Sequence, residues 1–520
     1  MSQTTPHTLD RYTQLSDLGN AVHNLFKRGI AISAVILLIG VAALYFSDNP
    51  GWLSLLMMGI GTLIAFKIWD NKGIGLPILP VFALQHLIAF GTPIISQDEK
   101  ISYYPPDYLL KAGFEVGLFL LVLSLMWRFG MEVFSPSPPL AYALNTFESD
   151  SSHSRIRIAL ILVISTTAYN VADALQASHF LFDLLPSGTS SLVTAVIKAV
   201  TMSGYFLLAM LVSSREAPPS IRAVFWITMV LNLVISASGF LLSSATDITA
   251  AVTIGLFWGS RRIPWAFIIT LVSILSFLHL GKFEMRERYW NADDEMTETA
   301  ADGLPQRYEE WILASFNNLS INRPALTGFE REKPKTASMI ERVNNLQNLL
   351  FAIHAVDGKK IETLDGATYA LIPPLLIPRI LWPDKPRAHE GQVLLNVHFE
   401  RQSAAATIRT YIAWGLLPEA YGNFGGVWGA VFLGAFLGIP FAWIENFTAR
   451  KPLLSMEGLV TFACFIGLAV SFEMVASVLI TSLFQTIIII IMACAPFVHQ
   501  ALVVRPVDSP AKTVTPPPSA

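Results

Sequence analysis

The strongest constraint on this chain is the recurrence of apolar runs that are each long enough to cross a lipid bilayer. A membrane-spanning helix needs about 20 mostly apolar residues, and an open chain in lipid must be helical because every backbone polar group has to be paired internally. The sequence therefore predicts an all-α polytopic membrane protein with about twelve transmembrane helices. The predicted spans are 30–47, 51–69, 75–96, 109–128, 156–175, 191–213, 222–242, 244–260, 263–281, 426–446, 456–476 and 478–500.

The amino-acid composition agrees with a lipid environment and excludes several classes of protein. Only 14% of the 520 residues are charged, whereas a soluble domain carries about 25%. This argues against an ordinary soluble enzyme and a disordered scaffold. The net charge of -3 gives no basic excess for a polyanion, so no nucleic-acid partner is expected. Cys464 and Cys494 both lie in apolar runs, which makes a disulfide framework or a Cys-rich metal site implausible.

The positions of Lys and Arg predict the orientation in the membrane. With twelve spans, the basic residues of the short loops fall almost entirely on one side, as with Lys72 after the second span and Arg262 after the eighth. Three of the loops on the other side, 47–50, 176–190 and 243–248, carry neither Lys nor Arg. We therefore expect a multi-pass protein of a bacterial inner membrane with both termini in the cytoplasm.

This topology divides the chain into five parts. They are a cytoplasmic N-terminal segment (1–29), nine helices (30–281), a large periplasmic loop (282–425), three more helices (426–500) and a disordered cytoplasmic tail (501–520). The loop is the only long hydrophilic region, and a connection of this length is usually functional. Polar residues within the spans are rarer, and Asn170 and Asp173 in the fifth span are interpreted as helix–helix hydrogen-bonding groups.

Three segments of the loop, and a cluster at its start, carry candidate functional residues. The spacing of Met339, Val343, Leu346, Leu350 and Ile353 predicts an amphipathic helix. Arg342 on its polar face either points into a site or belongs to a helix that only covers the membrane domain. A cluster at 282–288 contains Arg286, which is either a further site residue or a plain anchor at the outer interface.

The second segment, 377–390, combines stiffness with positive charge. Three prolines fix an extended path, and Arg379, Lys385 and Arg387 lie close together along it. Trp382 suits a membrane interface. Such cations bind either anionic lipid headgroups or a phosphate or pyrophosphate group, which Arg recognises in a bidentate manner.

The third segment, 404–425, is apolar enough to touch the membrane. A complete span here would reverse the topology, so we expect a re-entrant or interfacial segment containing a broken helix. It carries Arg409, Glu419, Tyr421 and Asn423. Charged groups at such depth are costly and are functional candidates.

Two motifs in these segments resemble the Wzy-type O-antigen and exopolysaccharide repeat-unit polymerases. They read Ile377-Pro378-Arg379 followed by Trp382-Pro383-Asp384-Lys385-Pro386, and Pro418-Glu419-Ala420-Tyr421-Gly422-Asn423-Phe424-Gly425. The upstream helix with Arg342 fits the same pattern. The resemblance implies a membrane glycosyltransferase that joins oligosaccharide units carried on undecaprenyl pyrophosphate. It also implies lipid partners, and a chain-length-determining co-polymerase and a flippase as protein partners.

The chemistry of this reaction gives each candidate residue a role. A pyrophosphate leaving group develops negative charge, which fixed guanidinium groups stabilise. Arg379, Arg387 and Arg409 would hold the donor, with Arg286 and Arg342 as further candidates and Lys385 adding positive potential. The acceptor hydroxyl needs a base, for which Glu419 is preferred and His389 is second. Tyr421 and Asn423 would contact sugar or brace the segment. No metal or other cofactor is expected.

Two other functions remain open at this point. An O-antigen ligase has a similar layout and transfers the glycan to another acceptor. A flippase or transporter of lipid-linked oligosaccharide predicts charges spread through the spans and inverted repeats, whereas here the charges gather in one loop and no repeat is visible.

Overall fold

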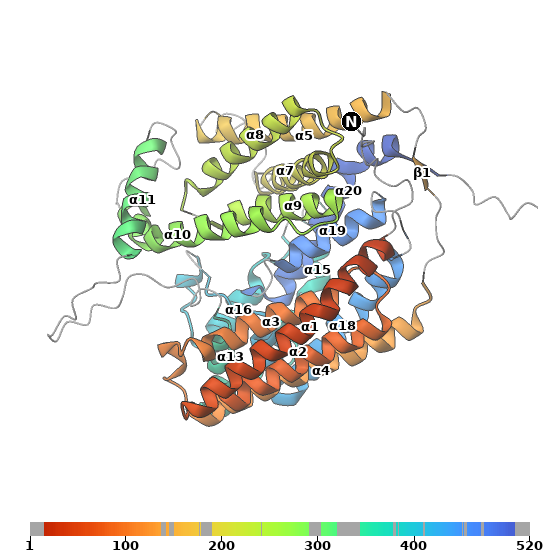
Figure 1. Ribbon diagram of the computed structural model, residues 1–520. Coiled ribbons are helices and arrows are strands. Elements are labelled where there is room, and N and C mark those ends of the chain that lie inside the picture. Colours follow the sequence, from red (N-terminus) through yellow and green to blue (C-terminus); the bar gives the residue numbers. More distant parts are fainter. Residues whose placement is uncertain are drawn as a thin grey trace, which may run out of the picture.

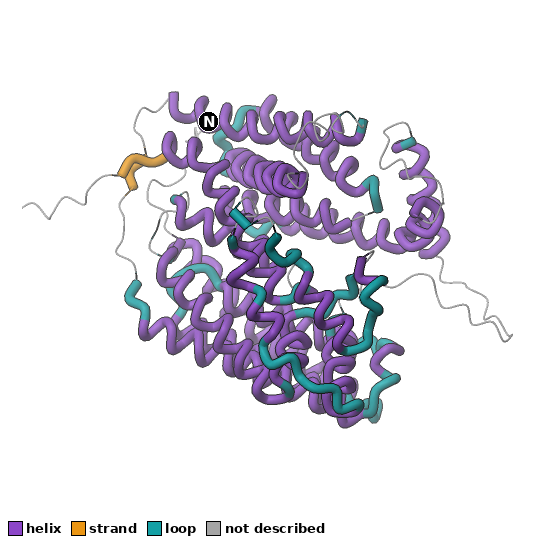
Figure 2. The backbone as a smooth tube through the Cα atoms, turned by 180° about the vertical axis from the view of Figure 1, so that it is seen from behind, coloured by secondary structure: helices purple, strands orange, loops and turns teal. Residues whose placement is uncertain are grey.

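The computed structural model of the chain is helical apart from one pair of three-residue strands. It describes residues 15–136, 142–144, 150–175, 177, 190–240, 242–290, 303–319, 344–377, 381–382, 384–408, 411–449, 451, 455–469 and 473–504. The strands β1 (Tyr142–Leu144) and β2 (Leu502–Val504) pair antiparallel at one edge of the molecule (Figure 2). The predicted all-helical class is confirmed.

Within these ranges, ten helices are long and apolar enough to cross a membrane, as a multi-pass membrane protein requires. They are α1 (Leu15–Phe46), α2 (Trp52–Lys72), α3 (Ile78–Ile95), α4 (Pro106–Val133), α5 (Asp150–Ala174), α7 (Ser190–Ser213), α8 (Pro219–Ala237), α10 (Trp265–Trp290), α18 (Gly426–Thr448) and α20 (Ala476–Ala501). Two more helices, α9 (Leu242–Ser260) and α19 (Met456–Ala469), coincide with the other two predicted spans but are not among the ten.

The first group of helices is built from α1 to α4 and α18 (Figure 1). The α4–α18 contact is close because glycines of α18 face it. A Cβ atom on Gly434 would lie 2.8 Å from Val122 Cβ, and one on Gly438 would lie 2.6 Å from the Leu123 carbonyl oxygen. Small residues allow membrane helices to approach in this way.

The second group contains α5, α7, α8 and α9 (Figure 1) and encloses a buried polar network. The Asn170 amide donates to Asn232 Oδ1 at 2.6 Å, and Asn232 Nδ2 donates to Thr167 Oγ1 and to the Tyr205 hydroxyl, each at 2.7 Å. The prediction that Asn170 bonds between helices is therefore confirmed.

Helix α20 contributes to the cores of both groups. Ala476 and Leu479 near its beginning are buried in the first core, and Ile490 and Cys494 further along are buried in the second. Figure 1 shows α19, in blue, between the two groups. Helix α20 therefore links the two groups of helices.

The region between α10 and α18 was predicted to be a large loop, and it contains several short helices. Helix α10 continues to Trp290, and the short elements that follow are α11 (Leu304–Leu319), α13 (Leu346–Ile353), the π-helical turn η2 (His354–Gly358), α14 (Ala367–Ala370), α15 (Ile372–Leu376), α16 (Glu390–His398), η3 (Ala406–Ile408) and α17 (Leu416–Phe424). The turn η1 (Glu99–Ile101) precedes α4.

Two predicted boundaries differ from the helix and strand ends. The loop was expected to begin at 282, but the charged residues there extend α10, supported by an i,i+4 pair of Glu284 with Arg288. The tail was expected to be disordered from 501, but Ala501 ends α20 and Leu502–Val504 form β2. Helix α1 begins at Leu15, while the part of it that could span a membrane begins at Gly29, one residue from the predicted start.

Candidate functional site

The first part of the site is α17, a short helix with a glycine at each end. Gly415 (φ 94°) and Gly425 (φ 69°) take left-handed backbone conformations that favour glycine. All residues from Leu416 to Asn423 are buried, and the helix packs against α13 and α18. Its length of about 14 Å is too short to cross a bilayer. The expected broken helix before α18 is therefore present.

Glu419 lies at the centre of this helix and is fully buried. Its Oε1 accepts a hydrogen bond from the Thr368 hydroxyl at 2.6 Å, and its Oε2 accepts one from the Ala476 N–H at 2.5 Å. Burial raises the pKa of Glu419 to about 7, against the opposing effect of these two donors. Asn423 supports the arrangement, because its amide donates to Thr368 Oγ1 and to the Glu419 carbonyl.

In this geometry the Glu419 carboxylate bonds within the protein. The carboxylate, on α17, bonds to Thr368 of α14 and to Ala476, the first residue of α20. The second bond satisfies an N–H at the beginning of a helix, which has no partner within the helix itself. A general base must come within hydrogen-bond reach of the acceptor hydroxyl, and both Glu419 oxygens are already occupied by protein donors. Asn423 likewise braces the segment rather than facing outward, because it is fully buried.

Tyr421 belongs to a second cluster on the same helix. Its hydroxyl donates to Asp357 Oδ2 at 2.6 Å, and Lys111 bonds to the same oxygen. The ammonium group of Lys111 also lies 5.5 Å from the centre of the Tyr421 ring. Burial and the neighbouring Asp357 hold the pKa of Tyr421 above its usual range. Asp357 occupies the π-helical turn η2, a kind of element that is frequent at functional sites.

The predicted cationic segment forms a third cluster. Lys385 Nζ donates to the carbonyl oxygens of Leu375 and Ile377, at 2.8 and 2.6 Å. The His389 ring stacks on Tyr411 with centroids 4.7 Å apart, and its Nδ1 bonds to Gln392 Oε1 at 2.8 Å. Arg387 pairs with Glu390 at 3.2 Å, and both side chains are exposed to solvent. Arg387 is thus available at the surface, while Lys385 is held by the backbone.

Three of the predicted arginines, Arg342, Arg379 and Arg409, lie outside the described residues. One described neighbour of each of two of these positions nevertheless contacts the stretch 385–389. The carbonyl of Ile377, two residues before Arg379, accepts from Lys385, and Tyr411, two residues after Arg409, stacks on His389. The stretch 385–389 therefore contacts described residues near both positions.

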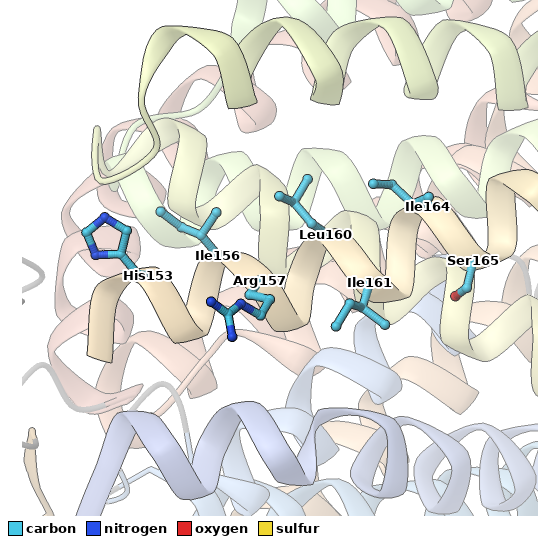
Figure 3. A pocket seen from close by; sticks show the side chains of 7 residues that line it. All are labelled: His153, Ile156, Arg157, Leu160, Ile161, Ile164 and Ser165. Carbon is cyan, nitrogen blue, oxygen red and sulfur yellow. The ribbon is translucent and has the colours of Figure 1, made fainter. Parts of the chain in front are cut away.

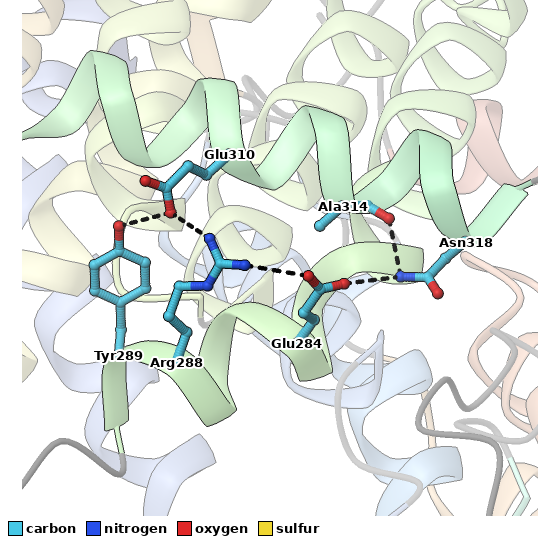
Figure 4. A network of polar contacts seen from close by, with 6 residues as sticks. All are labelled: Glu284, Arg288, Tyr289, Glu310, Ala314 and Asn318. Atoms are coloured by element: carbon cyan, nitrogen blue, oxygen red, sulfur yellow. Dashed lines mark hydrogen bonds and ion pairs between the residues drawn. The ribbon is translucent and has the colours of Figure 1, made fainter.

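Arg286 is in a different environment from the other candidates. Its Nε and Nη2 donate to the Phe240 carbonyl oxygen, at 3.2 and 3.0 Å, beside a small apolar core that includes Trp311. The adjacent residues Glu284, Arg288 and Glu310 join α10 to α11 through ion pairs (Figure 4). Of the two interpretations of Arg286, the anchor fits these contacts.

A cavity of about 510 Å³ opens elsewhere, along α5 (Figure 3). Its lining comes from a single helix and is mostly apolar, with Arg157 and His153 toward one end. None of the predicted site residues lines it. The described residues also contain no group of three or more His, Cys, Asp or Glu side chains that could hold a metal ion.

Three residues near these clusters were not predicted from the sequence. Lys111, Asp357 and Arg401 belong to no recognisable local motif. Lys111 lies near the start of a span and resembles an ordinary interfacial anchor. No signal in the local sequence pairs it with Asp357, which is 246 positions away.

No known protein family, curated protein or solved structure matches this chain.

Proposed function

We propose that this protein is an inner-membrane glycosyltransferase that polymerises oligosaccharide repeat units carried on undecaprenyl pyrophosphate. The two motifs that resemble Wzy-type polymerases support the proposal. The structural observation that carries it is that Lys385 bonds to Ile377, near Arg379, while His389, four residues later, stacks on Tyr411, near Arg409. A flippase and a chain-length-determining co-polymerase would be the matching partners.

The proposed topology has twelve spans, with α9 and α19 included, and both termini in the cytoplasm. The region between α10 and α18 then lies on the periplasmic side. A contact with the α3–α4 connection supports this placement, because the same side is assigned to that connection by the charge rule. Asn344 Nδ2 donates to Asp98 Oδ2 of the connection at 2.6 Å, and the adjacent Asn345 N–H donates to the carbonyl of Ala89, within α3, at 3.0 Å.

In the proposed reaction, an acceptor hydroxyl oxygen forms a bond to the anomeric carbon of the donor glycan. The bond from that carbon to the pyrophosphate oxygen breaks, and the pyrophosphate keeps the electron pair. Arg379, Arg387 and Arg409 would stabilise the charge that develops there, with Arg342 as a further candidate. The hydroxyl proton must pass to a base.

His389 is the better of the two candidate bases. With Nδ1 donating to Gln392 Oε1, the neutral ring keeps a lone pair on Nε2, and Nε2 makes no hydrogen bond within the described part of the chain. The ring is partly exposed and is oriented by stacking on Tyr411. Glu419, in contrast, is buried, and each of its carboxylate oxygens accepts a hydrogen bond from the protein.

The test is polymer formation by purified protein supplied with an undecaprenyl-pyrophosphate-linked oligosaccharide. We expect a ladder of products. Arg379→Ala should abolish the ladder, while the variant is still produced at the normal level and the single lipid-linked unit stays intact. Arg128→Ala is the matched control, because Arg128 is an exposed residue on the side predicted to be cytoplasmic and pairs with Glu132.

Three results would contradict the proposal. Polymer that persists unchanged in Arg379→Ala removes the assigned role of that residue. Transfer of the glycan only to a different acceptor identifies a ligase. Movement of the lipid-linked unit across the membrane without formation of a glycosidic bond identifies a transporter.

A further inference from the structure

Arg401 is a guanidinium enclosed by neutral groups just after α16. Its central carbon lies 4.9 Å from the centre of the Phe351 ring and 5.7 Å from that of Trp414. Its Nη1 donates to the Ala413 carbonyl at 3.1 Å, and its Nη2 donates to Asn348 Oδ1 at 2.7 Å. The side chain is therefore oriented by two rings and two uncharged oxygens.

No carboxylate in the described part of the chain pairs with this cation. Burial lowers the pKa of Arg401 to about 10, and the only ionisable group with a compensating effect is the Tyr104 phenol. A charge removed from water is costly unless an opposite charge accompanies it. Within the described residues, the guanidinium of Arg401 is therefore partnered by uncharged oxygens alone.

The remaining donors of Arg401 are suited to an incoming oxyanion. A guanidinium carries five N–H groups in a fixed fork, and within the described part of the chain only two hydrogen bonds are made by it. The residue as a whole is partly exposed. Phosphate and carboxylate groups are the ligands that this geometry binds in a bidentate manner.

Two aromatic side chains lie on the α4 side of Arg401. Tyr104 acts electrostatically on the Arg401 charge, and its ring centroid lies 6.0 Å from that of His354, while the Tyr108 centroid lies 6.1 Å from the same ring. Both tyrosines are partly exposed, Tyr104 just before α4 and Tyr108 in its first turn. Partly exposed tyrosine rings offer an apolar face and a polar edge that a sugar can contact.

We propose that Arg401 binds an oxyanion of the lipid-linked glycan, either the pyrophosphate of the carrier or the carboxylate of an acidic sugar. The inference rests on the proposed function and adds a binding residue that lies outside both polymerase-like motifs. Arg401 would be a substrate-binding residue, whereas Asn348 and Trp414 would position it.

The first test uses the unmodified full-length protein in detergent. Phenylglyoxal modifies accessible arginines, and peptide mass spectrometry reports the extent at each one. We expect sodium pyrophosphate or sodium glucuronate, at constant ionic strength, to slow modification of Arg401 by about tenfold or more, as a charge-assisted bidentate contact implies. Arg128, exposed and paired with Glu132, is the internal control and should react at the same rate throughout.

The two anions distinguish the two sources. Protection by pyrophosphate assigns Arg401 to the carrier, and protection by glucuronate alone assigns it to an acidic sugar of the repeat unit. If neither anion protects Arg401, the residue is a structural brace and the inference is overturned.

A variant provides the second test. Arg401→Lys keeps the charge but loses the planar fork, so binding of the protecting anion, measured by calorimetry, should weaken by about tenfold. Arg128→Lys is the matched control and should bind as the unmodified protein does. Equal binding by Arg401→Lys and the unmodified protein would contradict the proposal even if the variant were less stable.

The inference and the proposed function can fail separately. A protein that forms polymer while Arg401 remains unprotected retains the proposed function and loses this site. A protein in which Arg401 is protected but no glycosidic bond forms retains an oxyanion site and loses the polymerase assignment.

Discussion

The phenol of Tyr421 donates a hydrogen bond of 2.6 Å to Asp357 Oδ2 and thereby joins α17 to a π-helical turn 64 residues earlier in the chain. Lys111 of α4 bonds to the same oxygen. One carboxylate thus connects the start of a membrane helix to two segments of the region between α10 and α18. The outer part of the molecule is held to the membrane helices by polar side chains as well as by apolar packing.

Tyr421→Phe should lower the free energy of unfolding by about 1 kcal/mol, the usual net value of one hydrogen bond. The ring would keep its packing, and Asp357 would keep Lys111. Thermal unfolding in detergent measures the change. Tyr103→Phe is the control, because Tyr103 is 79% exposed and should unfold as the unmodified protein does. An unchanged midpoint for Tyr421→Phe would mean that the bond contributes nothing.

Glu419→Gln should remove a pH dependence of stability. Its pKa is about 7 in the folded protein against an ordinary value of 4.5, so the folded state binds the proton more tightly. The free energy of unfolding therefore falls as the pH rises from about 4.5 to about 7, by about 3 kcal/mol in total. An uncharged amide can accept from Ala476 and donate to Thr368, which abolishes this fall.

Unfolding midpoints measured across that pH range test the prediction. The matched control is Glu400→Gln, because Glu400 is exposed and its replacement should leave the slope in place. A slope that survives in Glu419→Gln would show that other groups cause it.

Gly434→Ala should separate α18 from α4 and destabilise the protein by about 1–3 kcal/mol, the usual cost of overpacking. The added Cβ would lie 2.8 Å from Val122 and 2.9 Å from the Leu123 backbone nitrogen, and backbone cannot move away easily. Gly40→Ala on α1 is the control, since its Cβ would meet nothing closer than 3.7 Å. Equal unfolding midpoints for the two variants would refute the close contact.

His389→Gln should slow polymer formation by about a hundredfold or more, as expected when a general base is removed. The initial rate of glycosidic bond formation at saturating donor is the measurement. His398→Gln is the control, because that ring bonds to the Glu362 carbonyl on the surface and should leave the rate unchanged. Full activity in His389→Gln together with a folded but inactive Glu419→Gln would return the role of base to Glu419.

The sequence predicted the membrane helices well because their signal is local. Each predicted span coincides with a helix, and only its ends shift, as at Trp290, where charged residues continue α10. The glycines on either side of α17 and the proline within it also signal a broken helix locally. Length and apolarity are properties of about 20 consecutive residues and need no knowledge of distant partners.

The contacts of the site could not be predicted in the same way. Glu419 was interpreted as a base because a charge in an apolar segment is a functional candidate. Its actual partners are Thr368, 51 positions away, and the backbone of Ala476, 57 positions away. Only the folded chain shows that both carboxylate oxygens accept hydrogen bonds from the protein, and only the folded chain places Arg401 over the rings of Phe351 and Trp414.

The bond from Glu419 to the first N–H of α20 has a consequence for how the protein is made. The ribosome synthesises Glu419 well before Ala476, which follows 57 residues later. During that interval the carboxylate has no helix terminus to bind, and the core that α20 shares with both helical groups is incomplete. Biosynthesis therefore assembles this region last, and a nascent chain acquires its mature outer surface only after its final helix has been inserted.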